Sequence, residues 1–112
     1  MKLKLFLTYD HELPLGKLKT SFSEALFEPT YQVFNVSEQC GVRVNLFTDI
    51  LCASRYKEWD YNNFYTPYKK QLSGSLNAGH DVQLHIHPHW LTSVYENSEV
   101  KPSSNLGLFD FS

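Results

Sequence analysis

The sequence predicts an α/β fold in which a parallel sheet is built from a β-α-β-α-β unit. Three short runs rich in β-forming residues, at residues 3–9, 42–47 and 82–86, are separated by two segments that carry helical signals. A helix that leads directly into an apolar strand is typical of a parallel crossover unit. The chain has 112 residues, 42% of them hydrophobic and 20% charged, which is the composition of one folded domain.

The first strand and the first helix are marked by local signals. Residues 3–9 alternate in polarity, and we expect this strand to end at Asp10. Pro29 suits the first turn of a helix, and Gly41 fits the position just past its end. The second strand then follows at once, with Thr48 and Asp49 at its end.

The second helix is predicted over residues 66–78. Thr66-Pro67 reads as an N-cap followed by proline at the first helical position, and Gly79 closes the helix. Apolar side chains recur every four residues and define one helix face: Phe64, Tyr68, Leu72 and Leu76. The aromatic residues between Tyr56 and Tyr68 are better explained as core than as a platform for sugar rings.

The third strand, residues 82–86, is stopped by Pro88, and the pattern then changes. We expect one domain over residues 1–112, with its core at 3–92 and a loop leading into a further element at 93–112. Three strands with two crossovers leave a parallel sheet incompletely covered. We therefore interpret the chain as the N-terminal part of a longer domain, with an open sheet edge through which copies could self-associate.

Composition and local pattern exclude several classes of partner. The formal net charge of −2 argues against nucleic acid, which proteins grip mainly through Lys and Arg. The apolar start ends at Thr8, too early for a signal peptide or a membrane span, so we expect a cytoplasmic protein. Cys40 and Cys52 lack the spacing of zinc ligands, and we expect two buried thiols.

Three histidines gather around the end of the third strand, in Leu84-His85-Ile86-His87-Pro88-His89-Trp90. His85 and His87 project from the same face, because side chains alternate with period two along a strand. If Pro88 bends the chain, His89 can instead turn back toward His85. Either pair offers two imidazoles to one divalent ion such as zinc.

A second polar cluster, Thr8-Tyr9-Asp10-His11-Glu12, ends the first strand. Functional groups in parallel sheets gather outside the carboxyl ends of the strands, so this cluster and the histidines are expected at one edge. A carboxylate beside two histidines completes a three-ligand metal site with an open position. Asp49, at the end of the second strand, is a weaker candidate for contact with substrate.

Two of these segments resemble the polysaccharide-deacetylase family, the NodB-homology carbohydrate esterases of family 4. Leu7-Thr8-Tyr9-Asp10-His11 is similar to the family's first motif, Thr-Phe-Asp-Asp, and residues 79–89 resemble its second motif, in which a His-x-x-x-His pair follows a Gly-His-Glu-like stretch. Val44-Asn45-Leu46-Phe47 stands where the family has a strand of the Ala-Thr-Phe-Phe type. The resemblance covers about residues 3–90, and it implies the N-terminal part of an irregular (β/α) barrel.

Carried over residue by residue, the resemblance makes Asp10 the catalytic base and His85 and His89 the metal ligands. The family's metal-binding aspartate falls at His11, so the third ligand could be His11 or Glu12. His87 has no counterpart in the common motif and is an alternative partner of His85. No histidine follows His89, so the family's general acid is expected to be missing from this chain.

The implied reaction is hydrolysis of an N- or O-acyl group, typically acetyl on an amino sugar or related carbohydrate. A divalent metal ion, with zinc expected, would polarise the acyl carbonyl, and Asp10 would take a proton from the attacking water. Two alternatives stay open. One is a non-catalytic metal-binding or assembly fragment, and the other is a different metal amidohydrolase that uses His-x-His on a strand.

Overall fold

The fold is that of a parallel α/β unit. The computed structural model describes residues 2–14 and 18–101, so the predicted loop at 102–105 and the apolar segment after it lie outside the described residues. Strands β1 (Leu7–His11), β2 (Val44–Asp49) and β3 (Asp81–His85) form a parallel sheet in the order β1-β2-β3. The predicted parallel sheet is confirmed, and these three strands do not close into a barrel.

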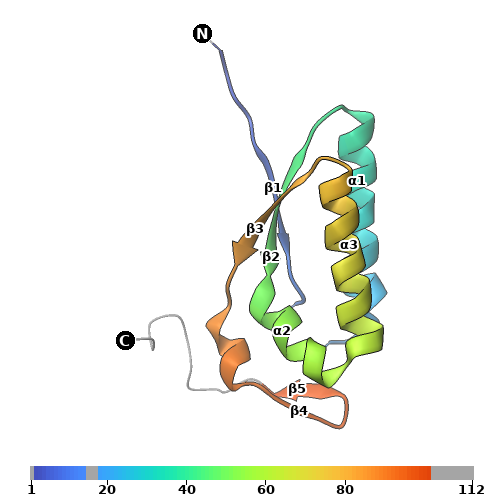
Figure 1. The fold of residues 1–112 in the computed structure, drawn as a ribbon, viewed down its shortest axis with the longest axis vertical. Helices are drawn as coiled ribbons and strands as arrows, with labels where there is room; N and C mark the ends of the chain where they lie inside the picture. Colours follow the sequence, from blue (N-terminus) through green and yellow to red (C-terminus); the bar gives the residue numbers. More distant parts are fainter. Residues whose placement is uncertain (1, 15–17, 102–112) are drawn as a thin grey trace.

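The first strand starts later than its sequence pattern predicts. The ladder with β2 begins where Leu7 pairs with Val44, and the preceding segment projects beyond the sheet (Figure 1). Leu3, Leu5 and Phe6 are therefore exposed, by 81%, 85% and 75%. The pattern predicted an extended segment, but the length of the strand is set by its partner.

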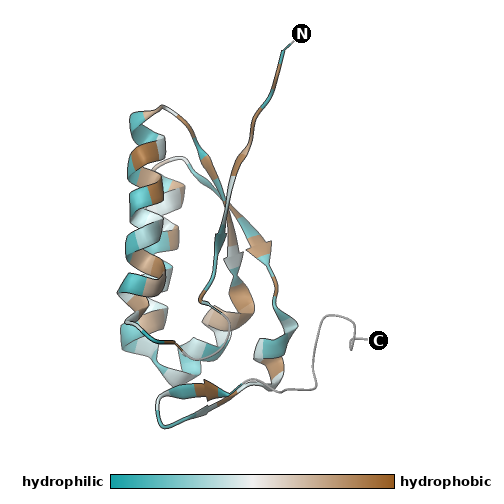
Figure 2. Cartoon of the chain, turned by 180° about the vertical axis from the view of Figure 1, so that it is seen from behind, coloured by the Kyte–Doolittle hydropathy of each residue, from teal (hydrophilic) through white to brown (hydrophobic). Residues whose placement is uncertain are grey.

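Helices α1 (Glu28–Gln39) and α3 (Thr66–Asn77) lie side by side on one face of the sheet (Figure 1). Phe34 of α1 packs between the helices and the buried side chains of Val44 and Leu46, and Leu72 of α3 joins the same cluster. Crossovers between parallel strands are almost always right-handed, so two that step in the same direction are expected to place both helices on one face. Apolar segments alternate with hydrophilic ones along both helices, as expected for helices with one face in the core (Figure 2).

Both helices end in the same backbone motif, and glycine makes it feasible. Gly41 and Gly79 have φ angles of +68° and +91°, which side chains with a Cβ rarely adopt. The amides of Gly41 and Val42 donate to the carbonyls of Glu38 and Ser37, the paired bonds of a Schellman motif. The amides of Gly79 and His80 repeat the pattern, so both predicted helix ends are confirmed.

The start of the second predicted helix is different from the expectation. Thr66 is already helical, because a π-helical turn, η2 (Tyr61–Tyr65), precedes α3 and is capped by the side chain of Asp60. A similar π-helical turn, η1 (Ser23–Phe27), precedes α1. The prediction of Thr66 as an N-cap was therefore wrong.

Helix α2 (Ile50–Trp59) begins directly at the end of β2 and was missed in the sequence. The Asp49 side chain accepts the amide of Cys52 at 3.3 Å and so caps the helix. The signal for this helix is a carboxylate followed by helix-forming residues, and in the sequence the same carboxylate also marks the end of a strand.

An aromatic cluster lies beneath the carboxyl ends of the strands. Its buried side chains come from distant parts of the chain: Leu13, Leu26, Phe27, Cys52, Ala53, Tyr56, Phe64, Tyr68 and Trp90. The core interpretation of the aromatic segment is confirmed for Tyr56, Phe64 and Tyr68, whereas Leu76 is 56% exposed. Cys52 is buried as expected, but Cys40 is exposed because it caps the end of α1.

The segment after β3 is more ordered than the predicted loop. A 3-10 helix, η3 (Pro88–Thr92), leads into a hairpin of β4 (Val94–Glu96) and β5 (Glu99–Lys101). Asn97 and Ser98 form the turn with φ angles of 51° and 60°, as a type I′ turn requires. In the described part of the chain, no helix combines the length and apolarity needed to cross a bilayer.

The two faces of the sheet have different chemistry. Tyr9 and His11 of β1 face the helices, where Thr30 donates a hydrogen bond to the Tyr9 hydroxyl. Successive side chains alternate, so Thr8 and Asp10 lie on the opposite face, where they are exposed. Parallel register adds Asn45, Phe47 and Gln83 to this second face. This open face is mostly polar.

His80 of the Gly79-His80-Asp81 motif has a structural role. It is 5% exposed, stacks on Phe34 at 4.5 Å between ring centroids, and accepts the amide of Val44 through Nδ1 at 3.0 Å. Its Nε2 then donates to Glu38 at 3.0 Å. One ring thus joins the start of β2 to the end of α1.

Replacing His80 with alanine is expected to lower the free energy of unfolding by about 2–3 kcal/mol, because the buried Val44 amide loses its acceptor and Phe34 loses its stacking partner. Urea denaturation would measure this. A Glu38→Ala control removes only a half-exposed partner and should cost less than about 1 kcal/mol. Equal losses in both variants would contradict the role assigned to the ring.

Candidate metal centre

The carboxyl ends of the three strands bring the candidate residues to one edge of the sheet. Glu12 follows the last residue of β1, Asp49 ends β2 and His85 ends β3. Asp49 and His85 are direct register partners, and His11 pairs with Thr48, one position earlier along β2. The parallel ladder therefore places Glu12, Asp49 and His85 at the same level.

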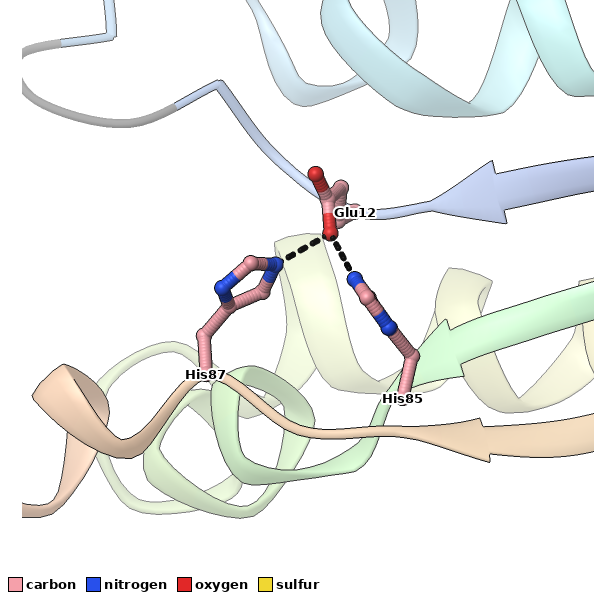
Figure 3. Close-up of side chains that lie close together, drawn as sticks. All are labelled: Glu12, His85 and His87. Carbon is pink, nitrogen blue, oxygen red and sulfur yellow. Dashed lines mark hydrogen bonds and ion pairs between the residues drawn. The ribbon is translucent and has the colours of Figure 1, made fainter. Parts of the chain in front are cut away.

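Glu12, His85 and His87 form a group that could hold a metal ion. Oε2 of Glu12 lies 2.8 Å from Nε2 of His85 and 2.5 Å from Nε2 of His87, so one oxygen faces two imidazoles (Figure 3). The two rings are almost perpendicular, at 89°, with centroids 4.5 Å apart. One ligand atom from each residue lies within 4.8 Å of the others, and all three side chains are partly buried.

His89 lies beside this group rather than in it. Its ring packs against Trp90 at 4.8 Å between centroids and lies 5.8 Å from the ring of His87. Partial burial lowers the pKa of His89, and the neighbouring His87 lowers it further. Of the two pairings left open by the sequence, the structure brings together His85 and His87.

Asp10, the residue expected to be the catalytic base, lies on the open face of the sheet. It is exposed and sits across from Phe47 in the ladder. Because side chains alternate along a strand, Asp10 and Glu12 project to the same side, with Cα atoms about 7 Å apart. The carboxylate of Asp10 is thus on the same side of the sheet as the ligand group.

The structure does not bring His11 to the metal group. His11 points to the helix side of the sheet, is fully buried, and uses both ring nitrogens in hydrogen bonds. Nδ1 lies 3.0 Å from the Thr48 hydroxyl and Nε2 lies 2.7 Å from Oε1 of Gln71. The alternation of the strand already separates His11 from Asp10 and Glu12, so this outcome was available in the sequence.

The partners of His11 define its tautomer. Gln71 donates its amide to the carbonyl of Phe27 at 2.9 Å, so its oxygen faces His11 and accepts from Nε2. Nδ1 must then accept from Thr48, whose oxygen lies 2.6 Å from the Tyr68 hydroxyl. Burial lowers the pKa of His11 to about 4, although the hydrogen bond with Gln71 opposes this shift. His11 is a neutral core residue.

Both carboxylate oxygens of Asp49 accept hydrogen bonds from other groups of the protein. Its Oδ2 accepts the indole N–H of Trp90 at 2.6 Å, its Oδ1 accepts the amide of Cys52, and the residue is 2% exposed. Burial raises the pKa of Asp49, whereas the two N–H donors and His87 lower it. Both carboxylate oxygens of Asp49 therefore accept hydrogen bonds within the protein, and its contact with substrate stays a prediction.

Sequence reasoning missed the bond between Asp49 and Trp90, which connects residues 41 positions apart. Trp90 directly follows the histidine segment and is buried at the carboxyl edge, but no local pattern identifies its partner. Cys52 does not contribute to the site, because burial raises the pKa of its thiol and keeps it protonated.

His11 should make the stability of the fold depend on pH. The unfolded histidine takes up a proton near pH 6.5, whereas the folded one does so only near pH 4, so stability is full above pH 6.5 and is lost as the pH falls through this window. Relative to a His11→Gln variant, the wild type should lose about 3 kcal/mol between pH 7 and pH 4. Denaturant titrations across this range test the expectation, and parallel curves would refute it.

Comparisons with protein-family models, with curated proteins and with solved structures found no match to this chain.

Proposed function

We propose that this chain carries the metal site of a hydrolase of the polysaccharide-deacetylase type, which removes an acyl group from an amino sugar or a related carbohydrate. The observation that carries the proposal is the convergence of Glu12, His85 and His87 at the carboxyl edge of a parallel sheet. Three segments of the chain that are far apart in sequence supply the edge, and parallel sheets bind ligands at this edge.

The ligand group fits a divalent metal ion. Two imidazoles and one carboxylate form a donor set that suits zinc, and such catalytic sites keep one position open for water or substrate. One carboxylate oxygen facing two imidazole nitrogens at 2.8 and 2.5 Å concentrates all three donors on one point. When bound, the ion would supply Lewis-acid polarisation of the acyl carbonyl.

Asp10 is the residue that would act as general base. It projects to the same side as Glu12 but is free of the ligand group, so it can accept a proton from an attacking water. Asp10 lies two residues before the ligand Glu12 along the strand, and the spacing of about 7 Å leaves room for a water molecule between the base and the ligands. Acyl hydrolysis by this route needs a substrate with a polarisable carbonyl, such as an N-acetyl group.

The expected barrel and compartment belong to this proposal. The open sheet face carries Thr8, Asp10, Asn45 and Gln83, whereas most (β/α) barrels fill their interior with apolar side chains. The barrel is therefore proposed on the family resemblance alone. A cytoplasmic location would suit a carbohydrate or acylated small molecule as substrate. Neither nucleic acid nor a membrane is among the proposed partners.

A second candidate is a different metal amidohydrolase. The grouping of His85 with His87, rather than with His89, is a His-x-His arrangement at the end of a strand. Such enzymes usually carry the pair on their first strand, whereas here it follows the third strand of the sheet. The deacetylase type is therefore preferred, and a non-catalytic metal-binding fragment is the third candidate.

The purified chain is expected to bind one zinc or cobalt ion, measured by elemental analysis and by competition with a coloured chelator. His85→Ala and His87→Ala should each weaken binding more than about 100-fold, beyond the 10–100-fold effect typical of outer-shell partners. His89→Ala is the matched control, since it removes a neighbouring imidazole outside the group. A larger effect of His89→Ala would restore the pairing implied by the family resemblance.

Asp10→Asn is expected to reduce acetate release from N-acetylated amino-sugar oligomers by about 10²–10⁴-fold, because the general base is lost. Metal affinity should stay at the wild-type value, since Asp10 is outside the ligand group. A variant that kept full activity would refute the assignment of the base.

A further inference from the structure

The two histidines of the ligand group are held in place by different means. His85 is the last residue of β3 and is fixed by the ladder with Asp49. His87 lies two residues beyond the strand, where it precedes the 3-10 helix η3. The position of His87 over Glu12 therefore depends on what holds η3 against the sheet.

Trp90 anchors η3. Its indole is 4% exposed and packs in the aromatic cluster, with centroids 6.1 Å from Tyr56 and 6.3 Å from Trp59. The amide of Trp90 donates to the carbonyl of His87 at 3.2 Å, so the anchor is bonded to the backbone of the ligand residue. The indole N–H reaches the end of β2 through its 2.6 Å bond to Asp49.

Asp49 is the fixed end of this connection. It closes β2, caps α2 through the amide of Cys52, and is the register partner of His85. Asp49 thus contacts both His85, through the strand ladder, and Trp90, through the hydrogen bond of its side chain. A shift of the bond between Asp49 and Trp90 would move His87 relative to His85.

We propose that Asp49 and Trp90 form a latch that holds His87 over Glu12 and thereby sets the metal affinity of the site. This inference rests on the proposed function, and it makes Asp49 and Trp90 positioning residues rather than ligands. The chain of contacts runs from Asp49 to the Trp90 indole, from the Trp90 amide to His87, and from the His87 ring to Glu12. Outer-shell partners of this kind orient ligands in metal sites.

Both oxygens of Asp49 are used in holding it. Oδ1 accepts the amide of Cys52 and Oδ2 accepts the indole N–H of Trp90. The carboxylate is therefore fixed between the start of α2 and the Trp90 anchor.

The test compares Trp90→Phe with Trp59→Phe. Both variants lose an indole N–H and the same side-chain volume. Trp90 lies in the aromatic cluster and donates to Asp49, whereas Trp59 packs against the cluster and stacks on Tyr95. Chelator competition with zinc and cobalt should show about 10–100-fold weaker binding for Trp90→Phe and unchanged binding for Trp59→Phe. The visible spectrum of the cobalt-loaded protein should shift in the first variant alone.

Asp49→Asn is the second variant, for use if Trp90→Phe does not fold. The amide places its NH₂ group against one of the two N–H donors and so breaks one bond while keeping the volume of the side chain. The expected loss of metal affinity is again about 10–100-fold. Equal affinities in Trp90→Phe and Trp59→Phe, or wild-type affinity in a folded Asp49→Asn, would overturn the latch.

The latch also has a readout that needs no metal. In the metal-free protein, the imidazole nitrogen signals of His87 in NMR spectra should shift in Trp90→Phe and stay in place in Trp59→Phe. If the wild type binds no metal, the proposed function fails, and this comparison alone decides the latch. Unmoved His87 signals in Trp90→Phe would then overturn it.

Discussion

The parallel pairing of β1, β2 and β3 is the constraint on which the site depends. Parallel strands end at one edge, so Glu12 and His85 meet although 72 residues separate them in the chain. The ladder fixes their level through the register of Asp49 with His85. The two Schellman motifs at Gly41 and Gly79 let each helix turn sharply into the next strand. Without this pairing, Glu12 would lie far from the segment that carries His85 and His87.

Alternation along β1 places neighbouring side chains on opposite faces of the sheet, where they have different roles. His11 faces the helices and, with Thr48 and Gln71, joins the sheet to α3 through neutral hydrogen bonds. Asp10 and Glu12 project to the other side, where Asp10 is exposed and Glu12 contacts His85 and His87. A shift of register by one residue would bury both carboxylates and expose the histidine. The core network of His11 therefore also fixes the direction in which the candidate base and ligand point.

Much of the fold could be predicted from the sequence, because strand composition, glycine positions and helix order are local signals. The edge location of Glu12 and His85 also follows from strand ends. The choice of His87 over His89 does not, since it depends on the path after β3, which the distant bond between Trp90 and Asp49 fixes. Helix α2 was missed because Asp49 serves as strand end and helix cap at once. The barrel implied by the family resemblance stays a proposal, because the three described strands form an open sheet that does not close.

The central claim is that the carboxyl edge of this sheet assembles one metal site from Glu12, His85 and His87. X-ray absorption spectroscopy of the zinc-loaded chain tests it most directly. The account predicts two imidazole nitrogens and one carboxylate oxygen at about 2.0–2.1 Å, with a water oxygen completing the shell. Scattering by sulfur at about 2.3 Å, or a shell without imidazole, would contradict it.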